Sequence, residues 1–436
     1  MKIKIAWKKY LISSFQIERG KIAMLFSFLF IICSVLFVTS CVGEVQRPNN
    51  HENKAFNAGL KIIDFEYKNP NGEKEIITAA IWYPTEEKEE PFTYRTTVNC
   101  ESRVAVDAPL SKKGGAYPLV LYSHGGYGSG FSSAFFMEYL ARNGYVIVAP
   151  DYKDTMPPDY TEQIAFERIK DGNTGRFFMV LRVGRRFVQD MEADRQLCIS
   201  YMNRQRLEPT AFILDKMIEL NRDRDSFLYQ AIREDEVGMC GHSLGGLTTI
   251  GVIGAHPDTR FKDARIKAAL VFSGAVYPFE NTVGNIDVPV MLMTGDNDES
   301  ELGKGLGIRR RLLYDKANPP KFYLILKNAT HFAFTNMVCE ESPLYQAVQN
   351  NPQAKAICEY GLAFFEKYFR RTSSADEKLK KLDSALAYYV REEIPGEKIE
   401  LGKEPPPGRG VGAGIMEEIM KTRRRRRRRL LKSWWE

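Results

Sequence analysis

Continuous apolar stretches alternate with segments of helical periodicity between residues 118 and 370. A strand that is apolar at every position has both faces buried, as in parallel sheets that helices cover on both sides. The alternation therefore predicts an α/β architecture with a mostly parallel central sheet and helices on both faces. The predicted strands are Pro118–Ser123, Tyr145–Pro150, Glu236–Cys240, Ile266–Phe272, Val288–Met293 and Phe322–Leu326, and the predicted helices are Ser132–Asn143, Phe187–Asn203, 246–255, 307–316 and 353–370.

The same pattern sets the domain boundaries. Two β-like stretches precede the alternation, at Leu60–Tyr67 and Glu75–Tyr83, and a polar linker at 41–58 comes before them. We therefore predict one main domain over 59–371. Residues 372–436 are expected to lie outside it, as a charged helix at about 374–392, a Pro- and Gly-rich linker and a basic tail.

Two segments within the main domain do not fit the alternation. Residues 153–185 are rich in Asp, Arg and Gly and are predicted to form a loop. Residues 206–232 form an additional helical piece, which is either a lid over a site or a surface insertion.

The charge is concentrated at the two ends of the chain. The net charge is +7, but residues 1–40 carry +5 and residues 421–436 carry +8, which leaves about −6 on the remainder. A mildly acidic main domain gives no reason to expect specific nucleic-acid binding. The basic run Arg423–Arg429 is followed by Leu430-Leu431-Lys432-Ser433-Trp434-Trp435, and it is either a solvated tail or a segment that binds an anionic surface.

The N-terminus has the organisation of an export signal. Basic residues precede the uncharged apolar run 22–38, and Val38-Thr39-Ser40-Cys41 resembles the lipobox of bacterial lipoproteins, in which the cysteine is lipidated. The alternative is an uncleaved transmembrane anchor. Both interpretations place the main domain outside the cytoplasm, attached to a membrane through the lipid on Cys41 or through the anchor. Five cysteines remain beyond this signal, of which Cys240 lies in a predicted strand, and Cys339 and Cys358 are candidates for a disulfide.

One short motif points to nucleophilic chemistry. Gly241-His242-Ser243-Leu244-Gly245 fits the pattern G-x-S-x-G, directly after a predicted strand and before a predicted helix. In that context the glycines permit a tight turn that exposes the serine hydroxyl above the sheet. Ser243 is therefore the candidate nucleophile.

A serine nucleophile needs a base, and the chain has only five histidines. His51 lies in the linker, His124 and His242 lie in glycine turns, and His256 closes a helix and is expected to face solvent. His331 follows the last predicted strand, where a loop can return to the nucleophile. It is the candidate base.

The orienting acid is expected in Thr294-Gly295-Asp296-Asn297-Asp298, after the strand that precedes the histidine strand. Asp298 is preferred because it lies deeper in the loop, with Asp296 as the alternative. Two backbone N–H groups must stabilise the oxyanion, and we expect them from Leu244 and from Gly126 in the loop Ser123–Gly128. That loop lacks the phosphate-binding patterns, and the histidines lack metal-ligand spacing, so neither a cofactor nor a metal is expected.

Together these motifs resemble the α/β-hydrolase superfamily, and within it bacterial esterases related to platelet-activating-factor acetylhydrolase, dienelactone hydrolase and cutinase-like polyester hydrolases. The resemblance covers about residues 60–370. The sequence stretches that carry this resemblance are residues 80–84, 118–126, 140–151, 241–246, 294–298 and 329–332. In the acetylhydrolase branch the acid follows the strand after the nucleophile helix, where this chain has Val271-Phe272-Ser273-Gly274. The resemblance therefore implies Asp298, as in the polyester-hydrolase branch.

The expected activity is hydrolysis of small or polymeric carboxylic esters through an acyl-enzyme intermediate. Two alternatives remain open: an amidase or peptidase with the same triad, and a catalytically silent binding protein of the same fold.

Overall fold

The computed structural model describes residues 56–96, 99–126, 128–152, 154, 193–298, 306–340 and 342–405. Four sequence-based predictions therefore lie outside the described residues: the signal with Cys41, most of the linker, the loop 153–185 apart from Asp154, and the run Arg423–Arg429. The chain divides into Met1–Asn53 and Lys54–Glu436, and every described residue belongs to the second unit.

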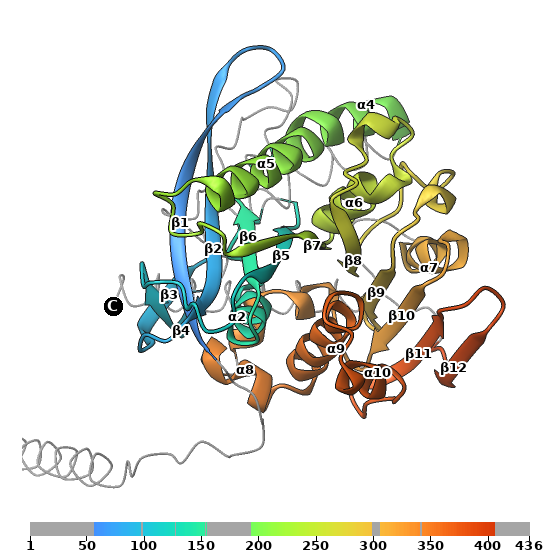
Figure 1. Cartoon of the computed structure of the whole chain (residues 1–436). Coiled ribbons are helices and arrows are strands. Elements are labelled where there is room, and N and C mark those ends of the chain that lie inside the picture. The colour runs from blue at the N-terminus through green and yellow to red at the C-terminus, as the bar shows by residue number, and fades with distance from the viewer. Residues whose placement is uncertain are drawn as a thin grey trace, which may run out of the picture. The chain divides into compact units, whose positions relative to one another are not determined.

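The sheet has twelve strands in the order β12-β11-β10-β9-β8-β7-β5-β6-β2-β1-β4-β3 (Figure 1). The six central strands from β10 to β6 are parallel, whereas antiparallel pairs flank them on both sides. The strands are β1 (Asn57–Lys68), β2 (Lys74–Thr85), β3 (Glu90–Arg95), β4 (Asn99–Val106), β5 (Tyr117–Ser123), β6 (Val146–Pro150), β7 (Ile232–His242), β8 (Ile266–Phe272), β9 (Val290–Gly295), β10 (Lys321–Leu326), β11 (Leu386–Glu392) and β12 (Lys398–Gly402).

Helices cover both faces of the sheet. The helices are α2 (Ala134–Arg142), α4 (Arg195–Met202), α5 (Glu208–Arg222), α6 (Leu244–Ile250), α7 (Leu306–Lys316), α8 (Leu344–Asn350), α9 (Pro352–Phe369) and α10 (Ser373–Leu379), and the turns η1 (Asn203–Leu207), η2 (Gly251–Ala255), η3 (Thr259–Phe261), η4 (Val283–Asn285), η5 (His331–Phe334) and η6 (Asn336–Glu340) join them. Helices α2, α8, α9 and α10 pack on one face, and α4 to α7 pack on the other.

Strand β5 shows why its sequence is continuously apolar. All its residues are buried. Val120 and Tyr122 belong to the core under α2 and α9, whereas Leu119 and Leu121 belong to the core under α5 and α6. Successive side chains of a strand point to opposite faces, so a sheet with two covered faces requires apolar residues at every position. The predicted α/β fold with a largely parallel central sheet is confirmed.

The topology brings two loops together. Strand β5 lies between β7 and β6, so the chain crosses over β5 when it passes from β6 to β7. At such a switch point the loops leaving the carboxyl ends of neighbouring parallel strands diverge and form a crevice. The loop after β5 carries Gly126, and the turn after β7 carries Ser243.

The segment 206–232 belongs to the core. Helix α5 lies across the sheet (Figure 1), and its Ile213, Leu214 and Met217 are almost completely buried. Within this segment, α5 is therefore one of the helices that cover the sheet.

The predicted helix at 374–392 is wrong in its second half. Helix α10 ends at Leu379, and Leu386–Glu392 forms strand β11, which pairs with β10. Tyr388, Tyr389 and Val390 are buried there. Aromatic and β-branched residues favour a strand once a partner edge is available, and that edge is not visible in the local sequence. The fold thus continues past residue 371 to β12.

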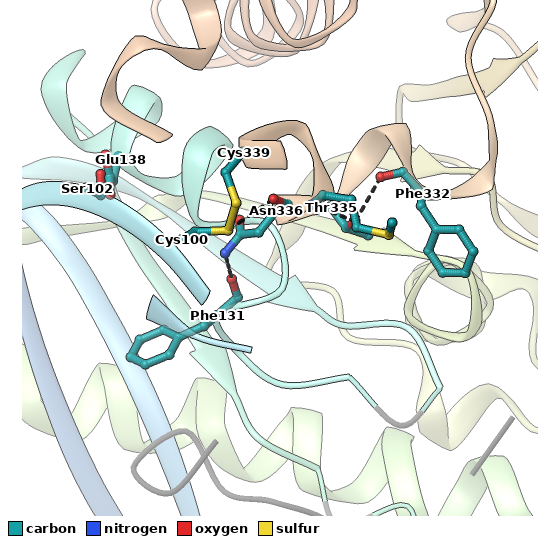
Figure 2. The surroundings of a disulfide bond; sticks show 9 residues. Cys100, Ser102, Phe131, Glu138, Phe332, Thr335, Asn336 and Cys339 are labelled. Atoms are coloured by element: carbon teal, nitrogen blue, oxygen red, sulfur yellow. Dashed lines mark hydrogen bonds between the residues drawn. A yellow bond between two sulfur atoms is a disulfide. The ribbon is translucent and has the colours of Figure 1, made fainter. Parts of the chain in front are cut away.

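The disulfide joins Cys100 to Cys339 (Figure 2). Cys358, the other candidate partner of Cys339, is a buried free thiol. The bond links β4 to η6, and next to it the Asn336 side-chain amide donates to the carbonyl of Phe131 at 2.8 Å. A cross-link between residues 239 positions apart is expected to stabilise the fold by about 5 kcal/mol through the lost freedom of the unfolded chain. It fixes the segment that directly follows His331.

Candidate active site

Ser243 occupies a strained turn between β7 and α6. Its φ is +55° and its ψ is −116°, a conformation that costs a non-glycine residue about 1–3 kcal/mol. The Ser243 N–H donates to the carbonyl of Phe272 at 2.9 Å, which holds the turn against β8. A serine in a strained strand-to-helix turn is the backbone arrangement that the motif predicts.

Both glycines of the motif are required by close backbone approach. A Cβ on Gly241 would lie 2.2 Å from the carbonyl oxygen of Gly245, and a Cβ on Gly245 would lie 1.9 Å from the carbonyl oxygen of Ser123. Neither clash involves a side chain that can move away. The turn therefore packs directly on the end of β5.

His331 and Asp298 form a hydrogen-bonded pair. The Nδ1 of His331 lies 2.9 Å from Oδ1 of Asp298, whose side chain is fully buried, while the His331 side chain is partly exposed. Nδ1 donates to this carboxylate, so Nε2 is left as the acceptor that a general base needs. Asp296 instead accepts from the backbone N–H of Ala329 at 3.2 Å. Of the two candidate acids, Asp298 is the one that contacts the histidine.

Ser273 holds the other carboxylate oxygen of Asp298. Its hydroxyl donates to Oδ2, and its φ of +48° places it in the left-handed region. Ser273 stands at the position after β8 where the acetylhydrolase branch would carry its acid. The sequence analysis identified this position but not its hydrogen bond to Asp298, which comes from the loop after the next strand.

His242 joins the nucleophile turn to the histidine loop. Its Nε2 donates to the backbone carbonyl of His331 at 2.8 Å, and the two rings are 4.7 Å apart. Because His242 immediately precedes Ser243, this contact brings the loop of His331 close to Ser243. From the sequence, His242 was predicted only to lie in a glycine turn, and its contact with the His331 loop was not predicted.

The two predicted oxyanion donors lie side by side. A Cβ on Gly126 would be 3.6 Å from Cδ2 of Leu244, and one on Gly125 would be 3.4 Å from Cβ of Ser243. The loop after β5 thus lies against the start of α6. The two residues expected to supply the oxyanion donors, Gly126 and Leu244, are therefore neighbours next to Ser243.

His256 is buried, contrary to the expectation that it faces solvent. Its ring contacts Phe261 and Phe279, and its Nδ1 accepts from the N–H of Asp258 at 3.0 Å. Burial lowers the pKa of His256. This histidine packs in the core and takes no part in the site.

His124 is also completely buried, directly behind the loop of Gly126. Its Nε2 accepts from the N–H of Tyr152 at 3.0 Å, so its Nδ1 carries the proton and donates to the carbonyl of Gly125 at 2.7 Å. Burial, followed by the nearby charge of Arg206, lowers the pKa of His124 to about 3. The ring is therefore neutral near pH 7.

The low pKa of His124 predicts a loss of stability in acid. In the unfolded chain the pKa is about 6.5, so between pH 6.5 and about 3 the unfolded state binds more protons than the folded state. His124 should then lower the free energy of unfolding by about 1.4 kcal/mol for each pH unit below 6.5. Urea unfolding of wild type and His124→Asn from pH 7.5 to 4.5 measures this, because asparagine keeps an N–H donor but does not titrate. Parallel pH curves for the two proteins would contradict it.

In the described part of the chain, no group of three or more His, Cys, Asp and Glu side chains is arranged to hold a metal ion. A search of the same residues finds no helix with the length and apolarity that a membrane span requires.

Comparisons with known proteins agree with this architecture. No protein-family model matches the sequence, and no curated protein matches it significantly. Among solved structures, the chain is similar to a ferulic acid esterase from Streptomyces cinnamoneus, with a TM-score of 0.51 and 16% identity over 78% of this chain and 96% of that one. At this identity the likeness concerns the fold. The chain therefore shares its α/β fold, with a largely parallel central sheet, with that esterase.

Proposed function

We propose that this protein is a serine hydrolase of carboxylic esters. The observation that carries the proposal is the strained Ser243 turn, which a hydrogen bond from His242 to the His331 carbonyl links to the loop of the His331–Asp298 pair. The esterase named among similar structures is consistent with this chemistry.

The proposed reaction passes through an acyl-enzyme. His331 Nε2 takes the proton of the Ser243 hydroxyl as its oxygen attacks the ester carbonyl. The N–H groups of Leu244 and Gly126 stabilise the oxyanion, and His331 then returns the proton to the departing alcohol. Water, activated by the same histidine, attacks the acyl-enzyme and releases the acid and the free serine.

A substrate panel tests the proposal and separates it from the alternatives. We expect purified protein to hydrolyse p-nitrophenyl esters of increasing chain length, and a fluorophosphonate probe to label Ser243. Turnover of anilides at rates comparable to the esters would favour an amidase. Absence of both turnover and labelling would favour a silent binding protein.

We further propose that the protein acts outside the cytoplasm, anchored through Cys41. The Cys100–Cys339 disulfide supports this location, because such bonds persist in oxidising compartments. In a bacterial host, we expect labelled palmitate to enter the wild-type protein but not Cys41→Ser. Incorporation into both forms would contradict lipidation at Cys41, and a mature protein that retains residues 1–40 would favour the anchor.

A further inference from the structure

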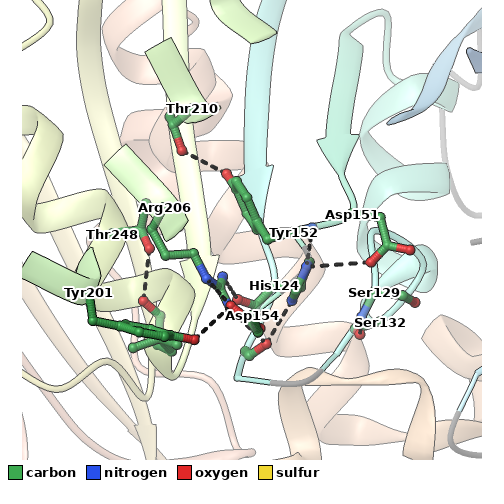
Figure 3. A network of polar contacts seen from close by, with 12 residues as sticks. His124, Ser129, Ser132, Asp151, Tyr152, Asp154, Tyr201, Arg206, Thr210 and Thr248 are labelled. Atoms are coloured by element: carbon green, nitrogen blue, oxygen red, sulfur yellow. Dashed lines mark hydrogen bonds and ion pairs between the residues drawn. The ribbon is translucent and has the colours of Figure 1, made fainter. Parts of the chain in front are cut away.

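A fully buried ion pair lies directly behind the loop of Gly126. Neither Arg206 nor Asp154 is exposed to solvent, and Figure 3 shows the two side chains in contact with each other, close to His124 and Tyr201. Arg206 Nε donates to Oδ1 of Asp154 at 2.7 Å, and Nη2 donates to Oδ2 at 2.5 Å. Burial of such a pair contributes little net stability, since desolvation offsets the attraction.

The rest of the guanidinium binds the backbone of the candidate oxyanion loop. Nη1 donates to the carbonyl of His124 at 2.7 Å, and Nη2 donates to the carbonyl of Gly125 at 3.2 Å. The Gly125 carbonyl also accepts from His124 Nδ1 at 2.7 Å and from the N–H of Gly128 at 3.1 Å. Three donors thus converge on one carbonyl oxygen.

These contacts determine where the Gly126 N–H points. The C=O of Gly125 and the N–H of Gly126 belong to the same planar trans peptide and point in opposite directions. Donors gathered on the carbonyl side therefore direct the N–H away from Arg206. Two adjacent glycines have wide conformational freedom, so the local sequence does not set this direction.

A side chain at position 125, which would stiffen the loop, would be crowded by the neighbouring turn. A Cβ there would lie 3.0 Å from Nδ1 of His242 and 3.4 Å from Cβ of Ser243. Rigidity must therefore come from contacts made by other parts of the chain, and the Arg206 guanidinium supplies two of them.

We propose that Arg206, held by Asp154, is a positioning residue for the oxyanion hole. It fixes the Gly125–Gly126 peptide so that its N–H needs no reorganisation when the oxyanion forms. Its charge also polarises that peptide and makes the N–H a stronger donor. This inference rests on the proposed esterase activity.

Two variants of the pair test the proposal. Arg206→Lys keeps the charge but has three N–H donors on a single nitrogen, so it cannot reproduce the four hydrogen bonds that the planar guanidinium makes. Arg206→Met/Asp154→Asn removes both charges together and leaves no unpaired carboxylate. The matched control is Arg142→Met/Glu138→Gln. Arg142 likewise pairs with the buried Glu138, also pairs with Glu89 and binds the Arg103 carbonyl, and none of these partners belongs to the site.

We expect both Arg206 variants to lose kcat by roughly 10- to 100-fold, less than the ~10²–10³-fold loss for an oxyanion donor removed outright. The KM for a soluble p-nitrophenyl ester and the pKa seen in the profile of kcat/KM should stay close to wild type, because the triad is untouched. The affinity of a trifluoromethyl ketone, which forms a tetrahedral oxyanion on the serine, should fall with kcat/KM. The Arg142 control should lose stability without these changes.

Two results would overturn the proposal. One is a folded Arg206 variant whose kcat and trifluoromethyl ketone affinity remain within twofold of the control. The other is failure of both Arg206 variants to fold while the control folds, which would make Arg206 a structural residue. Absence of esterase activity in the wild type would instead refute the proposed function, so the two failures are distinguishable.

Discussion

Replacement of Ser243 by alanine is expected to reduce kcat for ester hydrolysis by about 10⁶-fold, as for nucleophile removal in other triad enzymes. Alanine removes only the hydroxyl oxygen and accepts the same backbone strain, so the turn between β7 and α6 should persist. The KM should change little, because the hydroxyl acts mainly in the transition state. Steady-state kinetics of the purified variant, with circular dichroism to verify folding, measures the effect.

The control for this variant is Ser226→Ala. Ser226 lies in the turn after α5, before β7 begins, and its hydroxyl accepts only a local N–H from Leu228. Its removal should leave kcat unchanged. If Ser243→Ala retained more than a thousandth of wild-type turnover, or still reacted with the fluorophosphonate, the nucleophile would have to be another residue.

Asp298→Asn is expected to lower kcat by about 10⁴-fold through the wrong histidine tautomer. The geometry gives the reason. Ser273 donates its hydroxyl to one oxygen of Asp298, and His331 Nδ1 donates to the other. In the variant the amide oxygen would keep the Ser273 bond, which turns the amide NH₂ toward Nδ1. Nδ1 then becomes an acceptor, and Nε2 carries a proton that prevents it from acting as a base.

Asp296→Asn is the matched comparison, from the same loop. Asp296 accepts from the N–H of Ala329 without contacting the imidazole, and an asparagine oxygen can accept the same bond. We expect less than a tenfold loss of kcat. Folding of both variants should be verified by thermal unfolding. A larger effect at Asp296 than at Asp298 would assign the acid to Asp296 and require a different loop arrangement during catalysis.

The parallel strands of the core could be predicted, and the residues proposed for the triad could be selected, from the sequence because both depend on local sequence features. Burial on both faces leaves a continuous apolar stretch such as Pro118–Ser123, so composition alone indicates these strands. The turn at Ser243 requires glycines at fixed spacing, which a short motif records. Elimination among five histidines then favoured His331.

The remaining features depended on partners far apart in the chain. Arg206 meets Asp154 from 52 residues away, and Ser273 reaches Asp298 across 25 residues. Neither contact follows a local periodicity. The bond between Cys100 and Cys339 spans 239 residues, and a nearer cysteine made a different pairing look favourable in the sequence.

The segment 374–392 contains both a helix that the local sequence predicts and a strand, β11, that depends on a tertiary contact. Residues 374–392 carry charges at intervals compatible with a helix, and Ser373–Leu379 does form one. Leu386–Glu392 becomes a strand because the exposed edge of β10 offers backbone hydrogen bonds, and its face buries Tyr388 and Tyr389. Local sequence determines which segments bury both faces and where a turn must be glycine. The tertiary structure decides which strand edge, charged group or thiol each segment contacts. The free energies of these contacts arise only when distant parts of the chain are packed together.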